Sequence, residues 1–173
     1  MSRSWTFAII GLCAGLGGLG PACALDEVEP AAPQELTTIP GYRQRMSQVS
    51  TPYTSTLPPN PQIELWISSG ARTAYDRIRP DARGSNVTLP RGTLIVREVH
   101  DGGRVAKLTI MGKGEPGSNP PVGDWWFAVT TPTGEPLLEA GVRLIGKLPQ
   151  CVACHDERGA DDYLFGVTAA AHL

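Results

Sequence analysis

Two cysteines and a histidine form a compact motif near the end of the chain, Cys151-Val152-Ala153-Cys154-His155. Two thiols separated by two residues can add to the two vinyl groups of a haem, and the adjacent histidine can then bind the iron. The sequence therefore predicts one covalently bound haem c, attached through Cys151 and Cys154, with His155 as the axial ligand.

Three other interpretations of this motif each lack a required feature. A zinc site needs four ligands, and His100 and His172 are the only other histidines in the sequence. A thioredoxin-like CxxC is expected early in the chain, between a strand and a helix. A disulfide that closes so short a loop would be strained and would stabilise little. Haem attachment is the interpretation that uses all three residues.

The first 24 residues have the layout of a secretory signal. Arg3 provides a positive charge, residues 5–19 are uncharged and apolar, and Ala22-Cys23-Ala24 offers small residues for cleavage. Glycines and Pro21 interrupt the apolar run, which disfavours a permanent transmembrane helix. Export to the periplasm is the prediction, and it agrees with haem c because that cofactor is attached outside the cytoplasm.

A membrane-anchored lipoprotein is the alternative localisation. Residues 19–23, Leu-Gly-Pro-Ala-Cys, form a degenerate lipobox in which Cys23 would carry the lipid. Ala22 suits this interpretation, whereas Gly20 stands where an aliphatic residue is expected.

Composition limits the classes that fit the remaining chain. With 173 residues and a formal net charge of −2, the sequence fits one domain and lacks the basic surface that nucleic-acid binding requires. Its 20 glycines and 16 prolines disfavour a helical bundle. Residues 25–40 are acidic and proline-rich, so a flexible lead-in is expected before a single haem domain over 41–173.

Hydrophobic periodicity predicts the elements of that domain. Alternation favours a strand over 62–67, although a helix starting at Pro61 would also align its apolar residues. The turn Asp101-Gly102-Gly103 predicts a hairpin. The other expected elements are helices over 41–49 and 69–78 and strands over 93–99, 104–111, 125–130 and 137–145. The predicted fold class is α+β, mainly an antiparallel β-sheet meander with a few short helices packed around one haem.

Several motifs together resemble the cytochrome P-460 family, which includes the cytochrome c′-beta proteins. Residues 40–43 look like its Pro-x-Tyr-Arg opening, 92–98 like its Gly-Thr-x-x-x-Lys-Glu strand, and 124–127 like its Trp-x-Phe strand. The spacing from the haem histidine to Asp162 and Phe165 is the most specific part. The resemblance covers residues 40 to 165.

This resemblance implies a periplasmic monohaem protein with a mainly antiparallel fold, often dimeric, whose haem lacks a strong sixth ligand. The P-460 enzymes oxidise hydroxylamine and use a lysine that is cross-linked to the porphyrin, whereas the c′-beta proteins bind nitric oxide or carbon monoxide. Arg97 occupies the position of that lysine here. A guanidinium is always protonated and poorly nucleophilic, which disfavours the cross-link and the hydroxylamine chemistry.

Arg97 is the candidate residue on the distal side of the haem. It would donate hydrogen bonds to a bound anion, to a polarised diatomic or to a haem propionate. A surface arginine on a solvated strand is the alternative. Met111 is the candidate sixth ligand, with His100 and Met46 as further options, although a core methionine and an exposed turn histidine are the ordinary roles.

Two aromatic residues are candidate haem contacts. Trp125 and Trp126 must face opposite sides of their strand, so Trp125 either stacks on the haem or fills the core. Phe165 is expected to pack near the haem, and Asp162 to cap the turn after the haem motif. Lys107 and Lys113 are expected to be solvated.

The sequence thus predicts an exported monohaem c-type cytochrome with an open distal site for small nitrogen species, such as nitric oxide or hydroxylamine, or for other diatomics. A six-coordinate periplasmic cytochrome that transfers electrons to a redox protein is the alternative. A homodimer is consistent with the resemblance.

Overall fold

A computed structural model describes residues 34–56 and 59–173. The predicted export signal over 1–24, including Cys23, lies outside these residues. No helix in the described part combines the length and the apolar character needed to cross a membrane.

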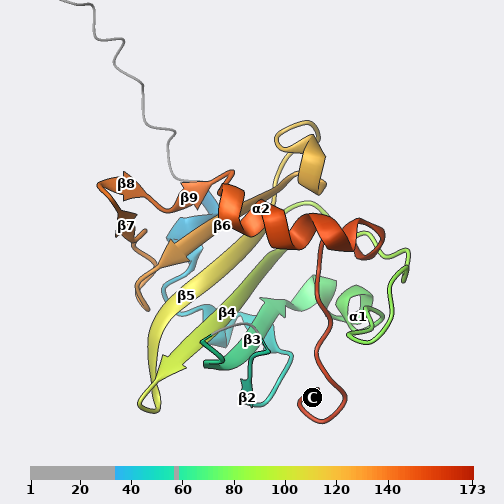
Figure 1. Ribbon diagram of the computed structural model, residues 1–173, viewed down its shortest axis with the longest axis horizontal. Coiled ribbons are helices and arrows are strands. Elements are labelled where there is room, and N and C mark those ends of the chain that lie inside the picture. The colour runs from blue at the N-terminus through green and yellow to red at the C-terminus, as the bar shows by residue number, and fades with distance from the viewer. Residues whose placement is uncertain (1–33, 57–58) are drawn as a thin grey trace, which may run out of the picture.

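The described chain is built on one antiparallel sheet, shown in Figure 1. Its strands are β1 (Met46–Gln48), β2 (Tyr53–Thr54), β3 (Gln62–Ser68), β4 (Leu94–Asp101), β5 (Arg104–Lys113), β6 (Trp125–Thr130) and β9 (Ile145–Gly146). They follow the order β1-β3-β4-β5-β6-β9, and β2 also pairs with β3. A separate pair consists of β7 (Leu138–Glu139) and β8 (Val142–Arg143).

The β4–β5 hairpin is the centre of the sheet. Ile95 lies opposite Met111, and the register holds until a bulge after Val99. Gly102 and Gly103 form the turn with φ angles of 54° and 77°, which glycine adopts without strain. The predicted hairpin is therefore confirmed, as are the strands expected over 62–67 and 125–130.

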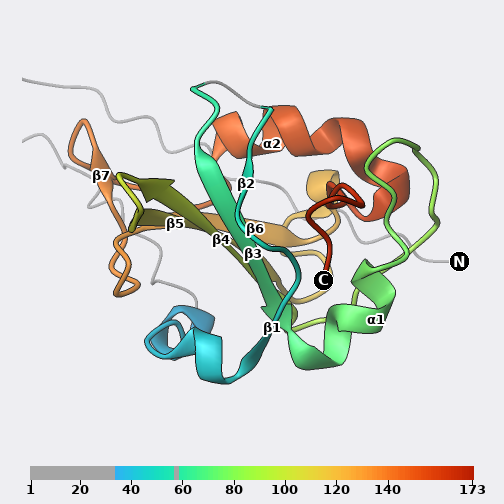
Figure 2. The same cartoon turned by 90° about the horizontal axis from the view of Figure 1, so that it is seen from below.

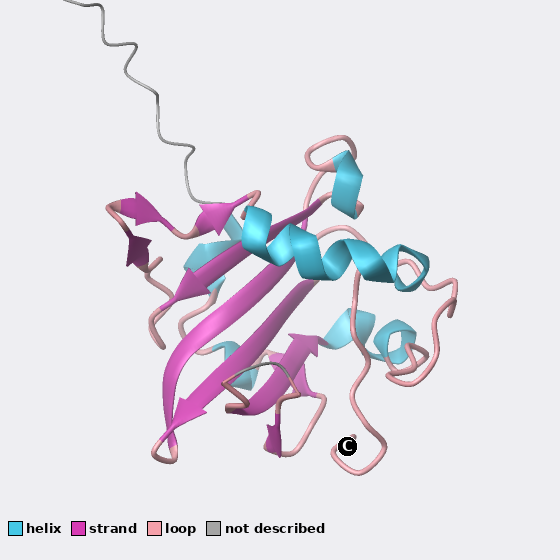
Figure 3. Ribbon diagram, in the orientation of Figure 1, coloured by secondary structure: helices cyan, strands magenta, loops and turns pink. Residues whose placement is uncertain are grey.

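Short helices, shown in Figure 3, cover the two faces of this sheet. They are the 3-10 helices η1 (Gln34–Thr38), η2 (Tyr42–Gln44), η3 (Ser69–Ala71), η4 (Pro120–Val122) and η5 (Asp156–Asp161), and the α-helices α1 (Arg72–Tyr75) and α2 (Pro149–His155). In Figure 2, α2 lies on one side of the sheet and the blue N-terminal helices lie on the other. The predicted α+β class, with a mainly antiparallel sheet, is confirmed.

Each face of the sheet has its own hydrophobic core. Phe127, Met111 and Ile95 belong to the core beneath α2, where Trp125 is also fully buried. Val96 and Ile110 belong to the opposite core, against η1 and η2. Because strand residues alternate between the faces, Trp125 and Trp126 separate as predicted, and the two cores stack on either side of one sheet.

Four predicted segments differ from the structure. The lead-in ends earlier than residue 40, because Leu36 of η1 and the following Ile39 are buried in the second core. The helix expected over 41–49 is replaced by the short helix η2 and then by strand β1. The side chain of Tyr42 is buried in the core, and residues 46–48 pair with β3. The helix expected over 69–78 is shorter and is divided into η3 and α1. The strand expected over 137–145 is interrupted twice: Ala140 and Gly141, both with positive φ, separate β7 from β8, and Leu144 separates β8 from β9.

A buried carboxylate joins η2 to the centre of the sheet. Glu98 is fully buried, and Arg43 donates from Nε to Oε1 at 2.7 Å and from Nη2 to Oε2 at 2.5 Å. The Tyr42 hydroxyl and His100 Nε2 complete its contacts. Burial raises the pKa of Glu98, but the hydrogen bonds from Arg43 and Tyr42 outweigh it, so the pKa lies below its usual value.

We expect Glu98→Gln to lower the free energy of unfolding by about 2–4 kcal/mol at neutral pH, because it leaves Arg43 without its counter-charge. The folded-state pKa of Glu98 is depressed, so its contribution is present above the unfolded pKa of about 4.3 and disappears as the pH falls through the folded pKa. Urea denaturation at several pH values measures both effects.

The control is Glu115→Gln, which removes an exposed carboxylate paired with Arg91 and should change stability by less than about 0.5 kcal/mol. Equal effects of the two substitutions would contradict a structural role for Glu98.

Candidate functional site

Helix α2 carries the CxxCH motif along the face of the first core (Figure 1). Pro149 begins the helix at a position where its missing N–H costs nothing. Cys151 and Cys154 are three residues apart, so their side chains lie on the same side of the helix. Both are free thiols; Cys151 is half-buried against the core and Cys154 is exposed. Burial, with a smaller effect of Cys154, raises the pKa of the Cys151 thiol to about 11.

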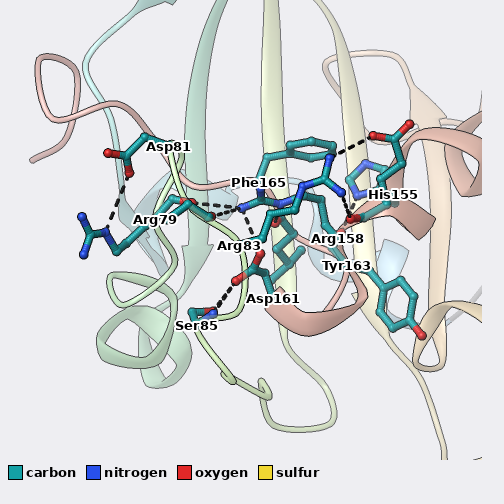
Figure 4. Close-up of polar contacts among 12 residues, drawn as sticks. Arg79, Asp81, Arg83, Ser85, His155, Arg158, Asp161, Tyr163 and Phe165 are labelled. Atoms are coloured by element: carbon teal, nitrogen blue, oxygen red, sulfur yellow. Dashed lines mark hydrogen bonds and ion pairs between the residues drawn. The ribbon is translucent and has the colours of Figure 1, made fainter.

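The His155 ring is fixed by one hydrogen bond and two aromatic neighbours. Its Nδ1 lies 2.6 Å from the Tyr163 carbonyl, which can only accept, so Nδ1 carries the proton (Figure 4). The rings of Phe127 and Phe165 lie 5.4 and 5.2 Å from the imidazole centroid. Among the described residues nothing hydrogen-bonds Nε2. This nitrogen is therefore available as a metal ligand, in the tautomer that metal binding requires.

Electrostatics also favour a neutral His155. Burial lowers its pKa, the hydrogen bond to Tyr163 acts in the opposite direction, and the charge of Arg97 lowers the pKa further. The neutral imidazole is the form that binds a metal. The strand register places Arg97 on the same side of the sheet, because Phe127, which packs on His155, lies opposite Met111, and Met111 lies opposite Ile95 on the Arg97 face of β4.

An unusual backbone conformation brings the Tyr163 carbonyl to His155. Asp162 and Tyr163 have φ angles of 54° and 62°, a left-handed region that side chains other than glycine adopt at a cost. Both the side chain and the backbone of Asp162 hold this turn. Its carboxylate accepts hydrogen bonds from Leu89 N at 2.8 Å and from Lys113 Nζ at 2.5 Å. Its carbonyl accepts a hydrogen bond from Trp125 Nε1 at 2.9 Å. Asp162 thus has the structural role that the sequence predicts, whereas Lys113 is not solvated.

A buried arginine fixes the same segment from the other side (Figure 4). Arg158 is only 6% exposed and lies 3.0 Å from Asp161 in an ion pair. Its guanidinium donates to the carbonyls of Leu164, Arg79 and Ala82 at 2.9–3.2 Å. Asp161 in turn accepts from the backbone and hydroxyl of Ser85. Arg158 therefore ties the loop around residues 79–85 to the turn that holds His155.

The two predicted aromatic contacts have different environments. Phe165 is 45% exposed while its ring packs on His155, so it has free surface beside the imidazole. Trp125 is fully buried, with Lys113 Nζ 4.9 Å from its ring centroid. Trp125 therefore packs in the core, which is one of the two roles that the sequence predicts for it, and its contact with a haem stays a prediction.

The candidate sixth ligands are each occupied in other contacts. Met111 is 8% exposed and buried beside Phe127, in the core beneath α2. His100 bonds Glu98 on the opposite face of the sheet, and Met46 packs in the opposite core. His100 is half-buried and paired, not the exposed turn residue expected from the sequence.

Arg97 does lie on the His155 side. It shares a face of β4 with Ile95, and its Nη2 donates to Ser55 Oγ at 3.2 Å. Burial lowers its pKa, opposed by the nearby Tyr53. Ser55 and Tyr53 were not identified from the sequence, since they lie among prolines in a segment without periodicity. Arg158 was also missed, because nothing in the sequence separates a buried arginine from an exposed one.

Comparisons with protein-family models, with curated proteins and with solved structures find no match. The chemistry of the site must therefore be judged from its own residues. These residues fit a haem attached through CxxCH. They provide two free thiols on one side of a helix, a neutral histidine whose Nε2 is available, and an exposed phenylalanine beside that histidine.

The structure also brings Glu64, Glu98 and His100 together, with ligand atoms within 4.8 Å of one another. Gln48 and Arg43 already bond the two carboxylates. This cluster is explained by the structural network around Glu98.

We expect Arg158→Gln to lower the free energy of unfolding by about 3–5 kcal/mol, because it leaves Asp161 buried without its counter-charge. Arg83→Gln is the matched control: it removes an exposed ion pair with Glu157 from the same region and should cost less than about 1 kcal/mol. Guanidinium denaturation compares the two. A similar, small effect of both would contradict the role assigned to Arg158.

Proposed function

We propose that this protein is an exported monohaem c-type cytochrome in which Cys151 and Cys154 hold the haem and His155 is its axial ligand. The observation that carries the proposal is the His155 ring, whose Nδ1 is bound to the Tyr163 carbonyl while Nε2 has no partner among the described residues. A metal-ligating histidine usually donates its other ring N–H to a carbonyl or carboxylate in this way.

The bound haem would supply an iron that can take up small diatomic and nitrogen species. The residues of the chain prepare its surroundings. The Tyr163 carbonyl keeps the proton on Nδ1 and fixes the ring plane. Phe127 and Phe165 pack their rings against the imidazole and restrict its orientation. Arg97 places a positive charge on the same side of the sheet.

An open distal site is the second part of the proposal. Met111 is buried in the core beneath α2, Met46 packs in the opposite core, and His100 bonds Glu98. The ligand is therefore proposed to be a small molecule, such as nitric oxide or another diatomic. The six-coordinate electron-transfer cytochrome has less support, since it needs one of these residues to bind the iron. Hydroxylamine oxidation is disfavoured by Arg97 at the position of the cross-linking lysine.

Contacts between distant motifs support the proposed relationship to the cytochrome P-460 family. Tyr42 and Arg43, in the opening motif, both bond Glu98, the last residue of the Gly-Thr strand motif. His155 of CxxCH bonds Tyr163, which lies in the motif that ends at Phe165. Motifs of one family are expected to meet in this way because each pair stabilises the other.

We expect the full chain, expressed with a haem c maturation system, to carry haem that resists acidic acetone and gives the pyridine haemochrome of thioether-bound haem. Cys151→Ser and Cys154→Ser should each lose one thioether bond and shift that band. Ala153→Ser, between them on the same helix and also exposed, should behave like the unsubstituted protein. Haem that is absent or freely extractable from the unsubstituted protein would contradict the proposal.

The role of Met111 provides a separate test of the open distal site. Because Met111 is a buried core residue, Met111→Leu should leave the absorption spectra of both oxidation states unchanged. It should lower the free energy of unfolding by less than about 1.5 kcal/mol. A change from low spin to high spin on this substitution would instead favour the electron-transfer alternative.

A further inference from the structure

Arg97 is a half-buried cation whose charge has no partner among the described residues. Its one hydrogen bond goes to the neutral hydroxyl of Ser55, and no described carboxylate lies within ion-pair distance. The other buried arginine, Arg158, has both an ion pair and three carbonyl acceptors. Arg97 therefore retains most of its five N–H donors for something else.

The lack of a counter-charge has a physical consequence. Burial of a charge is costly unless an opposite charge or several hydrogen bonds compensate it. A lysine could escape this cost by deprotonation, but a guanidinium remains charged in proteins. A bound anion would remove the cost and use the free donors.

Tyr53 adds a second unused donor at the same place. It pairs with Ile63 on β3, which in turn lies opposite Val99 on β4, so Tyr53 and Arg97 are on the same face of the sheet. The phenol packs against the core beneath α2, yet its hydroxyl has no hydrogen bond to any described residue. Arg97 also bonds Ser55, two residues after Tyr53, so the two polar groups lie in the same region of the sheet.

We propose that Arg97 and Tyr53 form a binding site for a planar anion with two oxygens, on the His155 side of the sheet. The fork of a guanidinium matches two such oxygens with parallel hydrogen bonds, and the phenol can donate a third. Ser55 holds the guanidinium in place. This inference rests on the proposed function, because it names the ligand class of that same site.

Two sources can supply this chemistry. One is a free oxyanion such as nitrite, which would make the distal site selective for an anionic nitrogen species. The other is a carboxylate of the haem itself, in which case Arg97 would orient the cofactor. In both cases the Arg97 guanidinium binds an anion. The two sources differ in whether the site is still free to bind an anion that is added in solution.

The experiment uses the haem-loaded full chain and three variants, Arg97→Gln, Tyr53→Phe and Arg104→Gln. Arg104 is exposed at the start of β5 in the same hairpin, so its loss changes the charge equally without touching the site. Nitrite is titrated into each protein by calorimetry. The reduction potential is then measured between about pH 5 and 8, where a carboxyl group freed from an arginine would begin to titrate.

A free-anion site predicts saturable binding of one nitrite, weakened at least tenfold by Arg97→Gln, several-fold by Tyr53→Phe and not by Arg104→Gln. A haem-carboxylate site predicts no nitrite binding, together with a pH-dependent potential that appears only in Arg97→Gln. If Arg97→Gln matches the unsubstituted protein in both measurements, the proposal is overturned and the guanidinium is simply solvated.

Failure of the proposed function would be recognised separately. The pyridine haemochrome of every sample reports whether haem is attached, and this readout does not depend on whether Arg97 binds an anion. If no haem is attached, the nitrite titration of the haem-free chain still measures the anion site.

Discussion

The hydrogen bond from His155 Nδ1 to the Tyr163 carbonyl is the contact on which the candidate site depends. It exists only because Asp162 and Tyr163 adopt a left-handed backbone conformation. Such a turn persists where its surroundings over-determine it, and here buried contacts do so from both sides. Asp162 is held by Leu89 and Lys113, and Arg158 fixes the preceding residues. The buried contacts of Asp162 and Arg158 thus help to orient the His155 imidazole.

The central strand β4 places two charged side chains, Glu98 and Arg97, on opposite faces of the sheet. Glu98 points into the face covered by η1 and η2, where Arg43 and Tyr42 satisfy it. Arg97, one residue earlier, points to the face of α2, where no described carboxylate meets it. The charge of Glu98 is thus neutralised within the fold, whereas the charge of Arg97 has no counter-charge among the described residues. Breaking a buried ion pair is destabilising, whereas the half-buried, unpaired charge of Arg97 is the basis of the proposed anion site.

Sequence patterns predicted the central sheet better than its surroundings. Alternation and the Gly102-Gly103 turn were enough for the main hairpin, because side-chain period and turn geometry are local properties. They could not separate the two roles of Trp125, since burial depends on what packs from elsewhere. The CxxCH motif located the candidate site, but Tyr163 contributes a backbone carbonyl, and a carbonyl has no signature in a sequence.

The central claim is that His155 binds a haem iron whose opposite side is open. The resonance Raman spectrum of the ferrous, haem-loaded protein tests it most directly, because it reports both the axial histidine and the coordination number. The account predicts a five-coordinate, high-spin haem with an iron–histidine stretching band that disappears when carbon monoxide is added. A six-coordinate, low-spin spectrum without that band, unchanged by carbon monoxide, would contradict the account.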